Sequence, residues 1–192
     1  MRNSSTNTAV LNFAPDVLRN AQGIRVIFFD VDGVLTDGGL YFTEAGETMK
    51  RFNTLDGHGL KLIQQAGITP VIISGRDSKP LRQRIDALGI THFHLGSEAK
   101  YPAAQQILET LGLDWQQAAM MGDDWPDLAV MQYCAFTCAP PNAHVEVKSR
   151  AHYLTQAAAG FGAVRELCDL LLIANGQYVR LLEPYLSSQR AK

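Results

Sequence analysis

The feature that most constrains the fold of this 192-residue chain is a nearly continuous apolar segment that ends in two carboxylates. The segment spans residues 24–29, and Asp30 and Asp32 follow it directly. A short apolar run bounded by turn residues is typical of a strand that is covered on both faces. Open α/β sheets bind ligands beyond the carboxyl ends of such strands. We therefore expect both acids at a ligand-binding edge, and the turn that Gly33 permits leaves their relative directions open.

Length and composition predict one well-buried domain. The chain is 46% hydrophobic and contains no linker rich in Ser, Gly or Pro. We assign the domain to residues 24–174, with an N-terminal extension at residues 1–23 and a C-terminal tail at residues 175–192.

Charge and cysteine content favour a small-molecule partner in the cytoplasm. The net charge is −2 and the basic residues are scattered, which argues against nucleic acid or a membrane surface as the partner. No segment approaches the roughly 18 consecutive apolar residues of a membrane span, and the first eight residues are polar. The three cysteines are odd in number and form no metal-binding spacing, so we expect them to be buried and reduced.

Short apolar runs alternate with segments of helical spacing along the rest of the chain. This alternation predicts an α/β fold, a three-layer Rossmann-like parallel sheet. Further strands are expected at residues 68–73, 92–95, 118–121, 135–138 and 152–154. Helices are expected at residues 14–22, 57–66, 79–88, 101–111, 127–131 and 163–174.

One segment departs from this alternation. Residues 39–53 contain two strand-like runs, 40–43 and 48–52, on either side of residues 44–47. We interpret the segment as a β-hairpin that starts at the acidic edge of the sheet and acts as a flap over it. A decorative edge hairpin is the alternative.

Polar residues follow three other expected strands. They are Ser74, Gly75 and Arg76 after the second strand, Lys100 after the third, and Asp123 and Asp124 after the fourth. Mg²⁺ prefers a few carboxylate oxygens together with substrate phosphate, which Asp30 and Asp123 are able to supply. Ser74 and Lys100 are suited to holding phosphoryl oxygens. A carboxylate can also accept a phosphoryl group, and Asp30 is best placed for that role.

Four segments of the chain, taken in order, resemble the four motifs of the haloacid dehalogenase superfamily. They are Asp30-Val31-Asp32-Gly33-Val34, Ser74, Lys100 and Gly122-Asp123-Asp124. The resemblance implies that Asp30 is the nucleophile and that Asp32 acts first as general acid and then as general base. It also implies a Mg²⁺ site made by Asp30, Asp123 and the backbone carbonyl of Asp32. The intervals between the motifs leave no room for a separate cap domain. Asp124 and Asp37 remain open between direct and supporting or capping roles.

A narrower resemblance covers about residues 24–173. Residues 32–38, 52–59, 74–76 and 162–166 are similar to the 3-deoxy-D-manno-octulosonate 8-phosphate phosphatases, which act in lipopolysaccharide precursor synthesis. The resemblance implies a Mg²⁺-dependent homotetramer that hydrolyses a sugar acid phosphate, with a substrate site at Asp32, Asn53, Ser74, Gly75, Arg76 and Lys100. Its apolar hairpin residues, Leu40, Phe42 and Met49, then lie between subunits, with a monomer as the alternative.

Two positions bear on the choice of substrate. Relatives that act on nine-carbon sugar acid phosphates tend to have Glu where this chain has Arg76, and an Arg suits a substrate carboxylate. Arg76 pairing with an acid on the neighbouring helix is the alternative. Phe161 stands where the family usually has Lys or Arg, which changes any anion contact from that loop. A nine-carbon substrate and a non-catalytic oligomerisation module of a cytidylyltransferase system are the alternative functions; the retained acids argue against the second.

Overall fold

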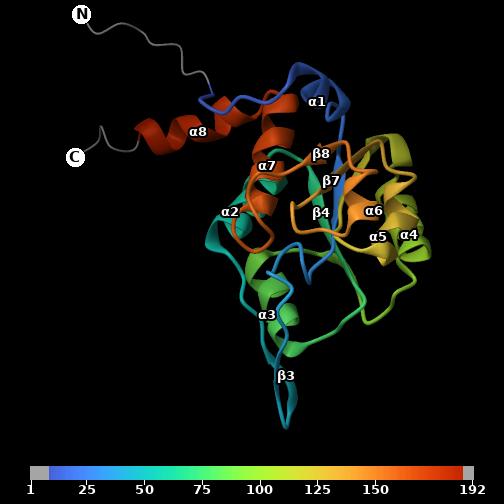
Figure 1. Ribbon diagram of the computed structural model, residues 1–192. Helices are drawn as coiled ribbons and strands as arrows, with labels where there is room; N and C mark the ends of the chain where they lie inside the picture. The colour runs from blue at the N-terminus through green and yellow to red at the C-terminus, as the bar shows by residue number, and fades with distance from the viewer. Residues whose placement is uncertain (1–8, 188–192) are drawn as a thin grey trace, which may run out of the picture.

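The computed structural model describes residues 9–187 and contains a six-stranded sheet with helices on both faces (Figure 1). The strand order is β5-β4-β1-β6-β7-β8, and every neighbouring pair is parallel. The strands are β1 (Val26–Phe29), β4 (Thr69–Ser74), β5 (His92–Leu95), β6 (Ala118–Met121), β7 (Phe136–Ala139) and β8 (Tyr153–Leu154). The predicted three-layer parallel α/β fold is therefore confirmed.

Alternation along the strands divides the core between the two faces of the sheet. Ile27 and Phe29 of β1 pack into one apolar cluster, and Val26 and Phe28 pack into the other. The first cluster includes α2 (Thr54–Gln65), α3 (Lys79–Leu88) and α7 (Ala163–Ala174). The second includes α4 (Lys100–Leu111), α5 (Trp125–Met131) and α6 (Val145–Lys148). Because β1 is buried on both sides, its sequence is apolar throughout.

The chain order reverses at β1, and this reversal positions the site. After β1 the chain adds β4 and β5 on one side, and then β6, β7 and β8 on the other. Such a reversal opens a crevice beyond the carboxyl ends of the central strands. Asp30 comes directly after β1 in this crevice, and its amide donates a hydrogen bond to the carbonyl of Met121 on β6 at 3.1 Å.

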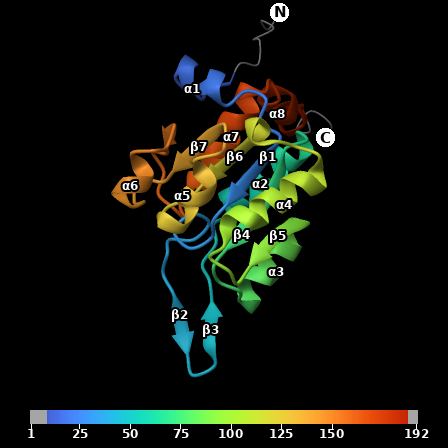
Figure 2. The same cartoon turned by 90° about the vertical axis from the view of Figure 1, so that its right-hand side faces the viewer.

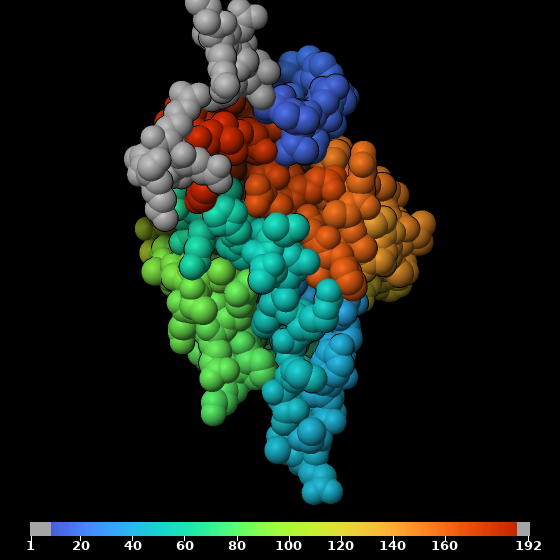
Figure 3. All heavy atoms as spheres, turned by 90° about the vertical axis from the view of Figure 1, so that its left-hand side faces the viewer, coloured from blue at the N-terminus to red at the C-terminus, as the bar shows by residue number. Residues whose placement is uncertain are grey.

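The expected hairpin forms a separate two-stranded sheet and projects from the same end of the molecule (Figures 2 and 3). It consists of β2 (Tyr41–Thr43) and β3 (Gly46–Met49), joined by a turn at residues 44–45. The prediction that the second strand covers residues 48–52 was wrong in its bounds. The strand already begins at Gly46, which takes a positive φ of 90° and pairs with Thr43. Lys50 therefore lies after the strand and turns inward.

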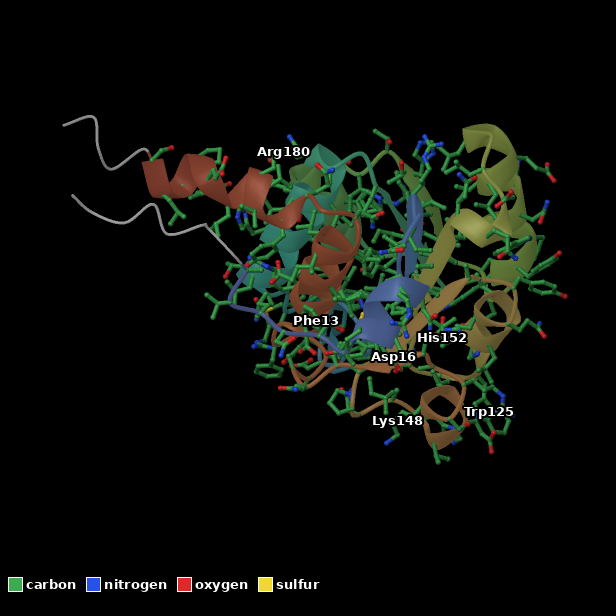
Figure 4. All side chains as sticks on the ribbon, turned by 90° about the horizontal axis from the view of Figure 1, so that it is seen from above. Phe13, Asp16, Trp125, Lys148, His152 and Arg180 are labelled. Carbon is green, nitrogen blue, oxygen red and sulfur yellow. The ribbon has the colours of Figure 1, made fainter. Side chains whose placement is uncertain are left out.

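The two ends of the described chain lie away from the hairpin (Figure 1). α1 (Pro15–Asn20) precedes the sheet, and the tail forms α8 (Tyr178–Ser187), which packs on α7. Seen from above, Arg180 of α8 and Trp125 of α5 lie on opposite sides of the molecule (Figure 4). The parts of the extension and the tail at residues 1–8 and 188–192 lie outside the described residues.

Three further observations concern the sequence predictions. The helix expected at 127–131 begins earlier, at Trp125, because the Asp124 side chain caps it in a capping box with Asp127. The 3₁₀ turn η1 (Trp115–Gln117) and α6 were not predicted. Across residues 9–187, no helix is both long and apolar enough to cross a membrane.

Candidate active site

A polar cavity of about 200 Å³ lies at the carboxyl ends of β1, β4 and β6. All of the predicted catalytic and metal-binding residues line it. The lining residues are Asp30, Asp32, Ser74, Gly75, Arg76, Glu98, Lys100, Asp123, Asp124, Pro126 and Asp127. Residues separated by more than ninety positions in the sequence therefore meet because parallel strands end at the same edge.

Lys100 connects the predicted nucleophile to an acid that the sequence analysis missed. Its ammonium nitrogen lies 2.6 Å from Oδ1 of Asp30 and 2.7 Å from Oδ1 of Asp127. All three side chains are buried, so these are charge-assisted contacts shielded from water. Lys100 thus holds the carboxylates of Asp30 and Asp127 in place at the cavity.

Asp127 is fixed more tightly than its neighbours. Its Oδ2 accepts hydrogen bonds from the amides of Asp123 and Asp124 at 2.9 and 3.2 Å. Gly122 is required for this approach, since an added Cβ there would lie 2.4 Å from Cβ of Asp127. The spacing of Asp127, four residues after Asp123 and in the first turn of α5, was the available indication in the sequence.

Asp32 has different partners from Asp30. Its Oδ1 accepts a hydrogen bond from Lys50 at 2.5 Å and lies 3.4 Å from the hydroxyl of Thr36. Its Oδ2 lies 3.8 Å from Nε of Arg76 and, although buried, has no hydrogen-bond partner. The two acids of the first motif are therefore directed into separate environments, as the turn at Gly33 allowed.

The loop after β4 brings the predicted substrate-binding residues Ser74, Gly75 and Arg76 to the cavity. Ser74 is buried, and its Oγ accepts a hydrogen bond from the amide of Arg76 at 3.2 Å. Gly75 lies so close to Glu98 that an added Cβ would be 2.1 Å from Oε1 of that side chain. Arg76 is half exposed, and its Nε lies 3.8 Å from Oδ2 of Asp32, which is in the loop after β1 and not on the neighbouring helix.

Burial and mutual repulsion raise the pKa values of two acids in the cavity. Desolvation, reinforced by the charge of Asp127 and opposed by Lys100, raises the pKa of Asp30 to about 7. Desolvation together with the charges of Asp30 and Asp127 raises the pKa of Asp123 to about 8. Burial alone would lower the pKa of Lys100, but the two carboxylates raise it above its usual range. The cavity therefore carries more negative charge than Lys100 neutralises.

This excess charge fits a divalent cation. Carboxylate oxygens of Asp30, Asp123 and Asp127 lie within 4.8 Å of one another. Since Asp127 is engaged by Lys100 and two amides, Asp30 and Asp123 are the carboxylates best placed to hold Mg²⁺. Asp123 also lies against the first motif, because an added Cβ on Gly33 would be 2.1 Å from its Oδ2. The carboxylate of Asp123 therefore lies close to the backbone of Gly33, next to Asp32, whose backbone carbonyl is part of the predicted metal site.

Asn53, predicted to bind substrate, does not line the cavity. Its Oδ1 accepts a hydrogen bond from the amide of Leu55 at 2.7 Å and so caps α2. Its Nδ2 contacts the carbonyl of Gly160 at 3.4 Å. In the described chain Asn53 therefore connects the end of the hairpin segment to the 159–162 loop.

The loop that carries Phe161 obtains a positive charge from the hairpin segment. The guanidinium of Arg51 lies 4.0 Å from the centroid of the Phe161 ring and also contacts Asp37 at 3.3 Å. Cation–π contact of this kind favours Arg over an aromatic face. Arg51 thus brings a cation next to Phe161, the position at which the family usually has Lys or Arg.

Two of the remaining family motifs contact each other. Oδ1 of Asp56 in α2 accepts a hydrogen bond from the amide of Arg165 at the start of α7, at 2.8 Å. Glu166 accepts hydrogen bonds from the Tyr153 hydroxyl and from the amides of Gln156 and Ala157. These contacts join α2 to the start of α7 and fix the segment that follows β8 against α7.

A parallel sheet with an acidic cluster, a buried lysine and a serine at one edge defines a haloacid dehalogenase-like hydrolase, and a family profile of that description matches residues 95–167. A 3-deoxy-D-manno-octulosonate 8-phosphate phosphatase from Yersinia pestis is 40% identical over 174 residues, covering 88% of this chain and 93% of that protein.

Solved structures of phosphatases are also similar to this chain. A probable phosphatase of the YrbI family from Pseudomonas syringae has a TM-score of 0.88 at 42% identity, covering 91% of this chain and 99% of that one. The Moraxella catarrhalis 3-deoxy-D-manno-octulosonate 8-phosphate phosphatase, solved with magnesium, phosphate and KDO, has a TM-score of 0.85 at 33% identity and covers 88% and 98%. The chain belongs to the family of 3-deoxy-D-manno-octulosonate 8-phosphate phosphatases.

Proposed function

We propose that this protein is a Mg²⁺-dependent phosphatase that hydrolyses 3-deoxy-D-manno-octulosonate 8-phosphate to 3-deoxy-D-manno-octulosonate and phosphate. The observation that carries the proposal is the meeting of Asp30, Asp123 and Lys100 at the carboxyl ends of the sheet, in a chain similar to named phosphatases along most of its length. The relative from Moraxella catarrhalis, with magnesium, phosphate and sugar acid bound, supports both the metal and the substrate class.

We propose the reaction that the family resemblance implies, and the positions of the side chains support it. Asp30 attacks the phosphorus atom, and Asp32 gives a proton to the leaving sugar oxygen as the phosphorus–oxygen bond breaks. Water then attacks the phosphorus atom, the bond from phosphorus to Asp30 breaks, and Asp32 takes the proton of the water. Ser74 and Lys100 hold the phosphoryl oxygens; Asp30 and Asp123 would hold Mg²⁺, which would supply positive charge against the charge that develops on those oxygens.

Replacing the nucleophile tests the catalytic assignment. Asp30→Asn keeps the shape of the side chain but cannot form the acyl phosphate, so we expect turnover to fall to background on every phosphate ester. Steady-state phosphate release with and without a chelator measures both the nucleophile and the metal dependence. Wild-type rates in the variant, or activity that resists chelation, would contradict the proposal.

Substrate choice is tested at Arg76. Its guanidinium is half exposed at the cavity and is suited to a bidentate contact with the sugar carboxylate. Arg76→Ala should lower kcat/KM for the eight-carbon substrate about 10- to 100-fold, and much less for a small ester that has no carboxylate. Equal losses of kcat/KM on both substrates would mean that Arg76 supports the structure of the site and does not bind the sugar carboxylate. A wild-type preference for the nine-carbon substrate would overturn the assigned substrate.

We also propose a homotetramer assembled through the hairpins. Phe42 is 61% exposed and Met49 is 55% exposed on a hairpin that projects from the domain (Figure 3). Burying these side chains between subunits removes an apolar surface from water and closes the cavity from outside. Phe42→Glu combined with Met49→Lys should yield monomers in light scattering and reduce activity. A fully active wild-type monomer would contradict the assembly.

We place the enzyme in the cytoplasm. Cys134, Cys138 and Cys168 are free and buried, which suits a reducing compartment. Cell fractionation with an antibody against the native protein tests this, and a periplasmic location would contradict it.

A further inference from the structure

Lys50 is one of two buried lysines in the described part of the chain, and the proposed reaction does not use it. Its side chain is 1% exposed, although it directly follows the exposed hairpin strand β3. Its ammonium lies 2.5 Å from Oδ1 of Asp32 and 2.8 Å from the carboxylate of Glu47. Burying a lysine is costly unless it is paired, so the chain is built to deliver this charge to Asp32.

The contacts of Lys50 make the two oxygens of Asp32 unequal. Oδ1 is engaged by the ammonium of Lys50 and lies near the hydroxyl of Thr36. Oδ2 is buried with no hydrogen-bond partner and has only Nε of Arg76 nearby, at 3.8 Å. A buried carboxylate oxygen without a partner is unfavourable in a resting protein, and in a polar cavity a ligand that donates or accepts a proton satisfies it.

Resting on the proposed function, we propose that Lys50 is a positioning residue that holds Oδ1 of Asp32 and leaves Oδ2 as the proton-transferring oxygen. In the first step the proton moves from Oδ2 to the ester oxygen, as the bond from phosphorus to that oxygen breaks and the bond to Asp30 forms. In the second step Oδ2 takes a proton from water, as the water oxygen bonds to phosphorus and the bond to Asp30 breaks. Lys50 keeps its own protons throughout.

The hairpin is therefore part of the acid–base machinery as well as a cover. Glu47 lies on β3, three residues before Lys50, so both groups belong to the hairpin segment. Burial opposes the ionisation of Glu47, but hydrogen bonds from Lys50 and Ser78 and the charges of Lys50 and Arg76 hold its pKa below the usual range. Glu47, Lys50, Asp32 and Arg76 form a row of alternating charges from the hairpin to the cavity.

The test compares esters that differ in their need for an acid. The sugar acid phosphate has an alkoxide leaving group that requires protonation, whereas p-nitrophenyl phosphate has a leaving group that does not. kcat/KM reports the steps up to loss of the leaving group. Lys50→Met should therefore lower kcat/KM about 100-fold for the sugar phosphate and less than about 5-fold for the aryl ester. Lys50→Arg should recover part of the loss, and Lys61→Met, on the exposed side of α2, should match wild type.

Two further variants separate positioning from folding. Glu47→Gln combined with Lys50→Met leaves no unpaired buried carboxylate at Glu47 and should show the same dependence on the leaving group. In an Asp32→Asn background, Lys50→Met should cause no further loss, because the group that it positions is absent.

Equal losses on both esters, or a full additional loss in the Asp32→Asn background, would overturn the role of Lys50 while leaving the phosphatase assignment intact. A wild-type protein that hydrolyses neither ester would instead refute the proposed function.

Discussion

Because the cavity holds excess negative charge, we expect the metal-free protein to become less stable as the pH rises. The pKa values of Asp30 and Asp123 are about 7 and about 8 in the folded protein, against an ordinary value of 3.8. Between about pH 4 and pH 8 the folded state therefore binds more protons than the unfolded state. The free energy of unfolding is therefore highest below about pH 4, falls as the pH rises from there toward the folded pKa values, and levels off above about pH 8.

The size of the effect follows from the shifts. One pKa unit corresponds to about 1.4 kcal/mol, so the rise of Asp30 from 3.8 to about 7 corresponds to roughly 4 kcal/mol. Above pH 5 the unfolded acids are already ionised, so only the part between pH 5 and each folded pKa acts there, about two pKa units for Asp30 and about three for Asp123. The two acids interact and their contributions do not simply add, so we expect a total of about 4 kcal/mol between pH 5 and pH 9. For a domain of this size that is a decrease in Tm of about 8–16 °C.

Thermal unfolding with a chelator or with excess Mg²⁺, measured at pH 5, 7 and 9, checks this prediction. The cation binds the ionised carboxylates, so added Mg²⁺ should raise Tm strongly at pH 9 and little at pH 5. Asp123→Asn serves as the control, since it removes one of the two titrating acids and should make the decrease in Tm clearly smaller while leaving the part that belongs to Asp30. A metal-free Tm that stays constant or increases from pH 5 to pH 9 would refute the reasoning, as would an unchanged slope in the control.

Three smaller perturbations follow from close contacts. Gly33→Ala places a side chain at a φ of 95° and against Asp123, so it should cost about 1–3 kcal/mol of stability and weaken Mg²⁺ binding in calorimetry. Asp127→Asn removes one of the two partners of Lys100, so kcat should fall while the variant, relieved of one repelling charge, keeps or gains metal-free stability at pH 9. Asp56→Ala leaves the start of α7 without its acceptor and should cost about 1–2 kcal/mol in urea unfolding with little change in kcat/KM.

The sequence was sufficient to predict the parts of the site that lie at strand ends. Asp30, Ser74 and Asp123 each follow a short apolar run, and parallel strands bring such positions to one edge whatever the intervening loops do. The hairpin was predicted as an element, but its second strand begins at Gly46 and ends at Met49, earlier at both ends than predicted. Lys50 was predicted to lie within this strand, and its burial beside Asp32 was not expected.

Other differences arise because one residue type serves several purposes. Asn53 matches a family motif, yet its carboxamide caps α2, a role that Asn fills at many helix starts. Asp127 was taken only as the first residue of a helix, since an acid in a first turn is ordinary; its contact with Lys100 depends on a lysine 27 residues away. Such pairings are set by tertiary packing and leave no periodic pattern in the sequence.

The cations that surround Asp30 and Asp32 differ, and this difference supports the separate roles that we propose for them. Asp30 is buried beside Lys100 with Asp123 close by, an environment that suits a nucleophile whose charge a metal ion also reduces. Asp32 contacts Lys50 through one oxygen and leaves the other without a partner, which suits a group that must both give and take a proton. Because Lys100 comes from α4 and Lys50 from the hairpin, separate elements control the two carboxylates, and the hairpin influences proton transfer without touching the nucleophile.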